Sequence, residues 1–284
     1  MNCGCSTSGV FGYIARMSDD PNPNLDVSGV VVTADFVRHR NVLLMQADLG
    51  PLFVDYYLHQ ADHRLRLAPA HDALLKQALV AFTLHSAARP RNEHLAWTIG
   101  LQDPRLNLFL AGDNEDCTVT GRVFTENVRE AGHNVFYSDV VPGRAAEKRR
   151  SVVNFAGADI FRAVETFYAT SEQRPARFFD LGNERFAMLI SHPDSDEAWL
   201  GRLGFAEVQS LEKSETLARI ERRLYRWQCG CSQKKILGAL APAARSDLAG
   251  LFGEGEVIQV QCPRCAASYA ITREAMEAHL AGPG

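Results

Sequence analysis

The spacing of hydrophobic residues changes several times along the chain, and each change predicts an element or a boundary. Residues 1–25 are rich in small and polar residues without a period, which predicts a flexible tail. From Val30 the pattern becomes that of a folded core, with short apolar runs at Val30–Val32 and Val42–Met45. Runs of this length bounded by polar residues are typical of buried strands. We therefore expect a first folded domain to begin near residue 26.

The stretch from Ala73 to Ala88 predicts a helix whose apolar residues cover more than half of its circumference, so it should be buried on most sides. Alternating apolar residues from Leu95 to Leu101 predict a half-buried strand. Asp159 is a suitable N-cap before an apolar helix face. Further strands are expected at 106–110, 118–124, 135–141, 152–155 and 185–190. These elements together predict an α+β or α/β domain over residues 26–193.

The hydrophobic pattern weakens after Asp194, where apolar residues are scattered among charged ones. Leu217, Ile220 and Leu224 then follow a helical spacing. We interpret residues 194–226 as a linker: a partly helical, weakly packed connector with too little chain for a core of its own.

Residues 227–284 form a last segment with its own short apolar patches and four cysteines. Val257–Val260 predicts a strand, and Ser246 and Thr272 are candidate helix caps. A segment of this size is marginally stable without a cross-link or a metal. We expect a small C-terminal domain whose folding depends on such a staple.

The four cysteines of this segment can supply such a stabilising site. The pair Cys229-Gly230-Cys231 is followed after thirty residues by Cys262-Pro263-Arg264-Cys265. Two short-spaced pairs at this separation predict one site with four thiolate ligands. Soft thiolates in tetrahedral number favour Zn²⁺, whereas the spacings typical of ferredoxin iron–sulfur clusters are absent. Cys229, Cys231, Cys262 and Cys265 are therefore the candidate zinc ligands.

Two roles for this site remain open at the level of sequence. A structural zinc would hold the segment folded, with an apparent binding energy on the order of 10–16 kcal/mol. Alternatively the site is a redox switch, because metal-bound thiolates are the form that oxidants attack. Each pair, Cys229 with Cys231 and Cys262 with Cys265, is close enough to form a local disulfide that would expel the metal.

Composition excludes several classes of protein. The chain has 284 residues, of which 46% are hydrophobic and 23% charged, which excludes a mostly disordered chain. Its net charge of −4, without a basic block, argues against nucleic-acid binding. It has no apolar run long enough for a membrane span and no apolar secretory signal near its N-terminus. We expect a cytoplasmic protein whose cysteines are kept reduced.

The remaining motifs predict no chemistry of their own. His59 and His63 have the spacing of a zinc-protease helix, but Gln60 stands where that motif needs a glutamate, so we expect two surface histidines. No nucleophile-elbow, dinucleotide or phosphate-loop sequence occurs, and we predict that the protein is not an enzyme. Cys117 is expected to be a passive thiol. Cys3 and Cys5 are either part of a stray tail or a pair that binds metal or exchanges disulfides.

The cysteine motifs resemble a known family. The runs Trp227–Ser232 and Cys262–Cys265 are similar to the zinc-binding end of the Hsp33 redox-regulated chaperones, and so are the flanking residues Glu254–Val257 and Tyr269–Glu274. Upstream, the run Tyr168-Ala169-Thr170-Ser171-Glu172-Gln173-Arg174-Pro175 resembles the end of a helix in that family.

This resemblance implies a function as well as a fold. It implies an ATP-independent holdase that binds unfolding client proteins under oxidative stress. In the family, the zinc-bound form is inactive, and oxidation forms a disulfide within each cysteine pair. Zinc then leaves, the linker unfolds, and activation is associated with a homodimer. The metal and redox roles fall on Cys229, Cys231, Cys262 and Cys265. The alternative is a protein-interaction module with constitutive structural zinc and no switch.

Overall fold

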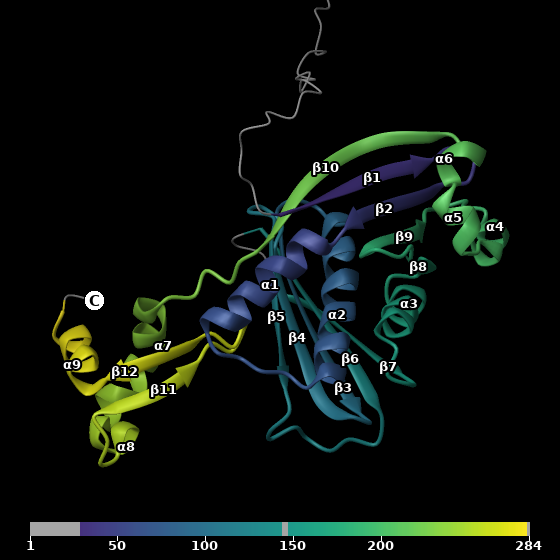
Figure 1. The fold of residues 1–284 in the computed structure, drawn as a ribbon. Helices are drawn as coiled ribbons and strands as arrows, with labels where there is room; N and C mark the ends of the chain where they lie inside the picture. Colours follow the sequence, from purple (N-terminus) through teal and green to yellow (C-terminus); the bar gives the residue numbers. More distant parts are fainter. Residues whose placement is uncertain (1–28, 144–146, 283–284) are drawn as a thin grey trace, which may run out of the picture.

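The computed structural model describes residues 29–143 and 147–282. The expected tail over residues 1–25, with Cys3 and Cys5, lies outside the described residues. Figure 1 shows a large α/β body with a small C-terminal module at one side. The expected mixed α/β class, with a small C-terminal domain, is confirmed.

The body is built on a sheet of ten strands in the order β7-β6-β3-β4-β5-β10-β1-β2-β9-β8. The strands are β1 (Val30–Val37), β2 (Val42–Asp48), β3 (Glu93–Gln102), β4 (Arg105–Asp113), β5 (Thr118–Phe124), β6 (Asn134–Pro142), β7 (Arg149–Phe155), β8 (Ala176–Asp180), β9 (Arg185–Ser191) and β10 (Leu217–Trp227). The helices of the body are α1 (Gly50–Asp62), α2 (Pro69–Ala87), α3 (Ile160–Thr170), α4 (Glu197–Arg202), α5 (Phe205–Gln209) and α6 (Leu211–Ser214).

The apolar run at the start of β2 is buried on both faces of the sheet. Leu43 and Met45 face the main core, to which α1, α2 and α3 contribute, whereas Val42 and Leu44 pack under the short helices α4–α6. Successive side chains of a strand point to opposite faces, so a strand covered on both sides must be apolar at every position. This explains why the segment is continuously hydrophobic.

The expected helix over Ala73–Ala88 and the alternating strand over Leu95–Leu101 are both present, as α2 and β3. Every residue of α2 from Ala78 to Ala87 is buried, and β3 alternates strictly between buried and half-buried positions. Asp159 caps α3 by accepting hydrogen bonds from the backbone amides of Phe161 and Arg162. Helix α1 and strand β8 were not expected from the pattern.

The expectation of a weakly packed, partly helical connector over residues 194–226 is corrected in two respects. Its first part forms α4–α6, whose buried residues Leu200, Val208 and Leu211 pack against β2, β8 and β9. Its last part is not helical, because residues 217–227 form β10, which pairs with all of β1 from Val30↔Tyr225 to Val37↔Leu217. Figure 1 shows β10 running from the short helices to the C-terminal module.

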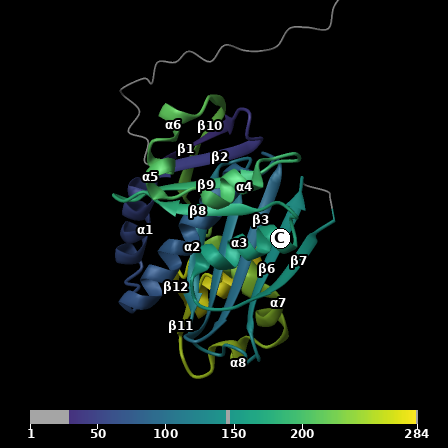
Figure 2. The same cartoon turned by 90° about the vertical axis from the view of Figure 1, so that its right-hand side faces the viewer.

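The C-terminal module consists of α7 (Gln233–Ser246), α8 (Leu248–Phe252), the hairpin β11 (Val257–Gln261) and β12 (Ser268–Thr272), and α9 (Arg273–Ala281). Figure 2 shows it on the far side of the body from α4. Its own core is small, and its buried residues are Ile236, Leu237, Ala244, Phe252, Ile271 and Met276. Thr272 caps α9 as expected, but Asp247, not Ser246, caps α8, since Ser246 still belongs to α7.

Candidate metal centre

The two cysteine pairs meet at the junction between β10 and the tip of the β11–β12 hairpin. The Sγ atoms of Cys229, Cys231, Cys262 and Cys265 all lie within 4.8 Å of one another. The Sγ atoms of Cys229 and Cys262 are 3.6 Å apart, and those of Cys231 and Cys265 are 3.5 Å apart. Cys262 and Cys265 are buried, and the other two are half-buried.

Local backbone structure places these sulfur atoms. Gly230 has a φ of +64°, a left-handed conformation that lets the chain turn between Cys229 and Cys231. In the second pair, the amide of Cys262 donates to the carbonyl of Ala267 (2.8 Å), and the amide of Ala266 donates back to the carbonyl of Cys262 (3.0 Å). The result is a closed hairpin tip with both sulfur atoms on the same side.

The four sulfur atoms fit a soft divalent metal ion. At a metal–sulfur distance of about 2.3 Å, a tetrahedron has sulfur–sulfur edges of about 3.8 Å. The distances of 3.6 and 3.5 Å between paired sulfur atoms are close to that value. Two further donors already point at the sulfur atoms: Tyr269 Oη donates to Sγ of Cys231 (3.1 Å), and the amide of Arg264 donates to Sγ of Cys262 (3.4 Å). Such donors orient thiolate ligands around a metal.

The electrostatics of the cluster favour a bound cation. The pKa of Cys229 is lowered to about 5, chiefly because its thiolate accepts a hydrogen bond from the Cys265 thiol. The pKa of Cys265 is raised, first by that same hydrogen bond and then by burial, and burial also raises the pKa of Cys231. One sulfur atom therefore gains thiolate character at the expense of its neighbours. A metal ion removes this conflict, because it stabilises all four thiolates together.

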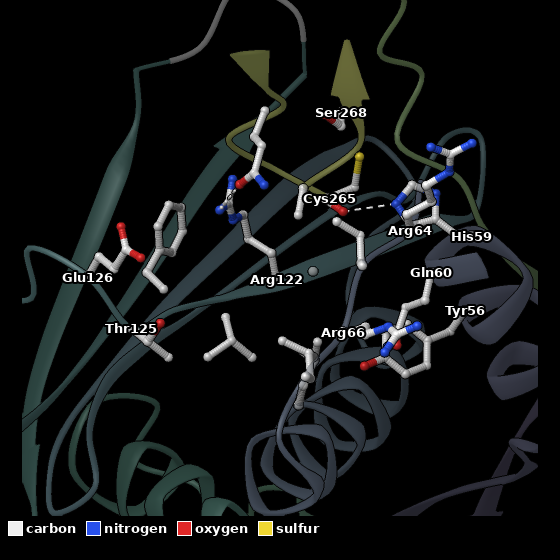
Figure 3. Close-up of a pocket in the computed structure, with 18 of the residues that line it drawn as sticks. Tyr56, His59, Gln60, Arg64, Arg66, Arg122, Thr125, Glu126, Cys265 and Ser268 are labelled. Atoms are coloured by element: carbon white, nitrogen blue, oxygen red, sulfur yellow. Dashed lines mark hydrogen bonds between the residues drawn. The ribbon is translucent and has the colours of Figure 1, made fainter. Parts of the chain in front are cut away.

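The body of the protein contacts the cysteine hairpin directly (Figure 3). Arg122 of β5 donates from Nη1 to the carbonyl of Cys262 (2.7 Å) and from Nη2 to Oε1 of Gln261 (3.1 Å). His59 of α1 lies with Nε2 2.9 Å from the carbonyl of Cys265. Because a carbonyl only accepts, Nε2 carries the proton in this contact.

Trp227, the last residue of β10, completes this boundary. Its ring lies 5.2 Å from the ring of Tyr56 and 5.5 Å from that of His59, measured between centroids. A cavity of about 710 Å³ lies between α1, β5 and the hairpin, and Figure 3 shows Arg122 and Cys265 on its wall. The cysteine site is therefore seated on the large sheet.

Comparisons with known proteins agree with this geometry. The family model described as "Hsp33 protein" matches residues 195–272. A 33 kDa chaperonin of Nitrosococcus oceani is 26% identical over 149 residues, which cover 45% of this chain and 52% of the relative. One of Symbiobacterium thermophilum is 32% identical over 109 residues, covering 33% of this chain and 37% of the relative. The matched region thus spans about half the length of these curated relatives or less.

A solved structure extends the likeness to nearly the whole fold. The 33 kDa chaperonin of Thermotoga maritima, titled a heat shock protein 33 homolog, superposes with a TM-score of 0.67 at 16% identity. The match covers 89% of this chain and 98% of that one. The chain is therefore similar to the Hsp33 family in its segment 195–272 and in its overall fold. At this identity the superposition shows the fold, and the motif-bearing segment carries the family likeness.

The other residues that the sequence singles out, Cys117, His59 and His63, are not members of the cysteine cluster. Among the described residues, Cys229, Cys231, Cys262 and Cys265 are the one group found that could hold a metal. Cys117 is half-buried at the turn before β5, and burial raises the pKa of its thiol. His59 and His63 are both partly exposed, and neither belongs to the candidate metal cluster. Their rings lie 4.7 Å apart at the C-terminal end of α1, and His59 also contacts the hairpin, which the sequence did not predict.

The sequence pattern did not reveal the residues around the cysteines. Arg122, Tyr269 and Trp227 are far apart in the chain or lie outside the cysteine spacing itself. Trp227 and Tyr269 stand in runs that resemble the Hsp33 family, but their spacing predicts no contact with the cysteines. An arginine at a half-buried position of an otherwise uncharged strand, β5, is the local signal that points to Arg122.

Proposed function

We propose that this protein is an ATP-independent holdase that binds unfolding client proteins and is activated by oxidation of its four-cysteine site. The observation that supports this most strongly is the convergence of four sulfur atoms within 4.8 Å in a chain whose residues 195–272 match the Hsp33 family model. The proposed setting is the reducing cytoplasm, where the thiols persist until an oxidant appears. No helix in the described part of the chain is long and apolar enough to cross a membrane.

The metal we propose is Zn²⁺, held by Cys229, Cys231, Cys262 and Cys265. Four soft thiolate ligands without an open position are typical of structural zinc. When bound, the ion would compensate the charge of the thiolates, and its coordination bonds would join the end of β10 to the hairpin. The module's small core makes this link necessary for its folding.

Oxidation removes the ligands pair by pair. In each pair, two thiolates give up two electrons to one molecule of peroxide, which takes up two protons and leaves as two molecules of water. One disulfide joins Cys229 to Cys231 and the other joins Cys262 to Cys265. Disulfide sulfur no longer acts as a thiolate ligand, so the link between β10 and the hairpin is lost.

The apolar surface available to clients follows from the fold. Loss of the link frees the module and exposes the boundary around Trp227 and Tyr56. The short helices α4–α6 cover a second apolar face made by Val37, Val42 and Leu44. We propose that these faces bind clients and that the oxidised form associates into a homodimer.

The test compares aggregation of a thermally unfolding client by light scattering in the presence of the reduced, zinc-loaded protein and of the peroxide-treated protein. We expect suppression by the oxidised form only. The double variant Cys262→Ser/Cys265→Ser should suppress aggregation without oxidant, because its site is open from the start. Cys117→Ser is the matched control and should behave as wild type. Equal suppression by the reduced and oxidised protein would rule out the switch.

A second candidate is a protein-interaction module with constitutive structural zinc. It is favoured by β10, because eight residues of this strand pair with β1 and so build the last part of the proposed linker into the sheet. This function predicts that Cys262→Ser/Cys265→Ser is destabilised and inactive, whereas the redox switch predicts a more active variant.

A further inference from the structure

Arg122 joins the body of the protein to the cysteine hairpin. Its guanidinium donates two hydrogen bonds to Cys262 and Gln261, and it lies 4.1 Å from the centre of the Phe124 ring on its own strand. Its Nε is buried without a hydrogen-bond partner among the described residues. The hydrogen bonds of Arg122 therefore go to the hairpin, and they hold the guanidinium between β5 and the hairpin.

The two docking contacts grip the backbone on both sides of the second cysteine pair. Arg122 reaches the carbonyl of Cys262 from β5, and His59 reaches the carbonyl of Cys265 from α1. Strand and helix thus hold the hairpin tip at two points three residues apart. The geometry requires the tip to keep the shape in which both sulfur atoms face the cluster.

Charge gives Arg122 a second role. Four thiolates around a divalent cation carry a net charge of −2, and the guanidinium is attracted by the thiolates of Cys262 and Cys265. Disulfide formation removes this negative charge and reshapes the turn that Arg122 and His59 hold. Charge-assisted hydrogen bonds are among the stronger polar contacts in proteins, so their loss weakens the docking.

We propose that Arg122, assisted by His59, is a positioning latch that docks the C-terminal module on the large sheet only while the four cysteines are thiolates. This inference rests on the proposed function for its link to oxidation. The docking itself belongs to the reduced protein and does not depend on any client.

The test measures amide hydrogen exchange of the reduced, zinc-loaded full chain in the segments 228–235 and 262–268. We expect Arg122→Ala to speed exchange there by at least about tenfold and to speed zinc transfer to a chromogenic chelator in parallel. Arg122→Lys, which keeps the charge and the stem but not the two-pronged donor, should give an intermediate effect. Arg105→Gln, on the neighbouring strand β4 with an exposed partner, is the matched control and should match wild type.

Wild-type exchange and wild-type zinc transfer in both Arg122 variants would overturn the latch. Arg122→Lys keeps the inference testable if Arg122→Ala disturbs β5 as a whole. These measurements use no oxidant and no client, so their failure is distinct from a failure of the proposed function, which would show as unchanged client protection after oxidation.

Discussion

His85 is a titratable side chain enclosed in the core of the body. It is 1% exposed, its Nδ1 lies 2.7 Å from the hydroxyl of Tyr168, and Nε2 has no hydrogen-bond partner among the described residues. Burial lowers its pKa well below the usual value, and the nearby cations Arg89 and Arg174 lower it further. The ring is therefore neutral in the folded state. A second ring proton would have to be buried without a hydrogen-bond partner among the described residues.

This makes stability depend on pH. Above the unfolded pKa of about 6.5, His85 is neutral in both states and its contribution is intact. As the pH falls below that value, His85 is protonated in the unfolded chain but stays neutral in the folded chain. The free energy of unfolding therefore decreases, by at most about 1.4 kcal/mol per pH unit for this group. We expect the decrease between pH 7.5 and 5.5 in denaturant unfolding to be smaller in His85→Gln than in wild type. The exposed His133→Gln serves as control, and equal slopes in all three would contradict this reading of His85.

At the same scale, the sequence predicted some site residues and not others for a physical reason. Two cysteines separated by one or two residues lie close together whatever the rest of the chain does. The spacing of Cys229, Cys231, Cys262 and Cys265 therefore predicts the metal site from the sequence alone. Arg122 and His59 reach the hairpin only because β5 and α1 are brought there by the tertiary fold. No local pattern encodes such a meeting.

At the scale of elements, β10 shows how pairing overrides periodicity. Leu217, Ile220 and Leu224 have helical spacing, yet the segment lies between β1 and β5 in the sheet. β1 offers eight partners along its length, and the backbone hydrogen bonds of that ladder decide the conformation. Only two residue pairs join β10 to β5, so the attachment to β1 carries the strand. Strands β2 and β3 were predictable because burial leaves a regular pattern along each, continuous at the start of β2 and alternating in β3.

The two parts of the connector, α4–α6 and β10, are also expected to differ in resistance to local unfolding, because only β10 is held by a long strand ladder. We expect amide hydrogen exchange of the reduced protein to be slow in β10 and faster in α4–α6, which are helices of at most six residues. After oxidation, protection should be lost from α4–α6 and from the module, while β10 stays protected from Leu217 to Tyr225. Loss of protection over β10 together with α4–α6 would show that the connector opens as one unit.

At the scale of the whole molecule, the body and the C-terminal module have hydrophobic cores of very different size and meet at one boundary. The body has an extensive hydrophobic core that includes Trp97 and Phe136. The module has only a few buried apolar residues besides the cysteine cluster. The sequence predicted this division, because cysteine clustering and the change in apolar density mark it directly. It could not predict the seating of one body on the other, since that depends on surfaces formed only after folding.

The central claim is that oxidation of the cysteine site, loss of its metal and chaperone activity are one event. The most direct measurement is a peroxide titration at mild heat that counts free thiols, released zinc and client light scattering in the same samples. The account predicts that zinc release and protection of the client rise together as thiols disappear from Cys229, Cys231, Cys262 and Cys265. Complete oxidation of these thiols with zinc retained, or with no gain in client protection, would contradict it.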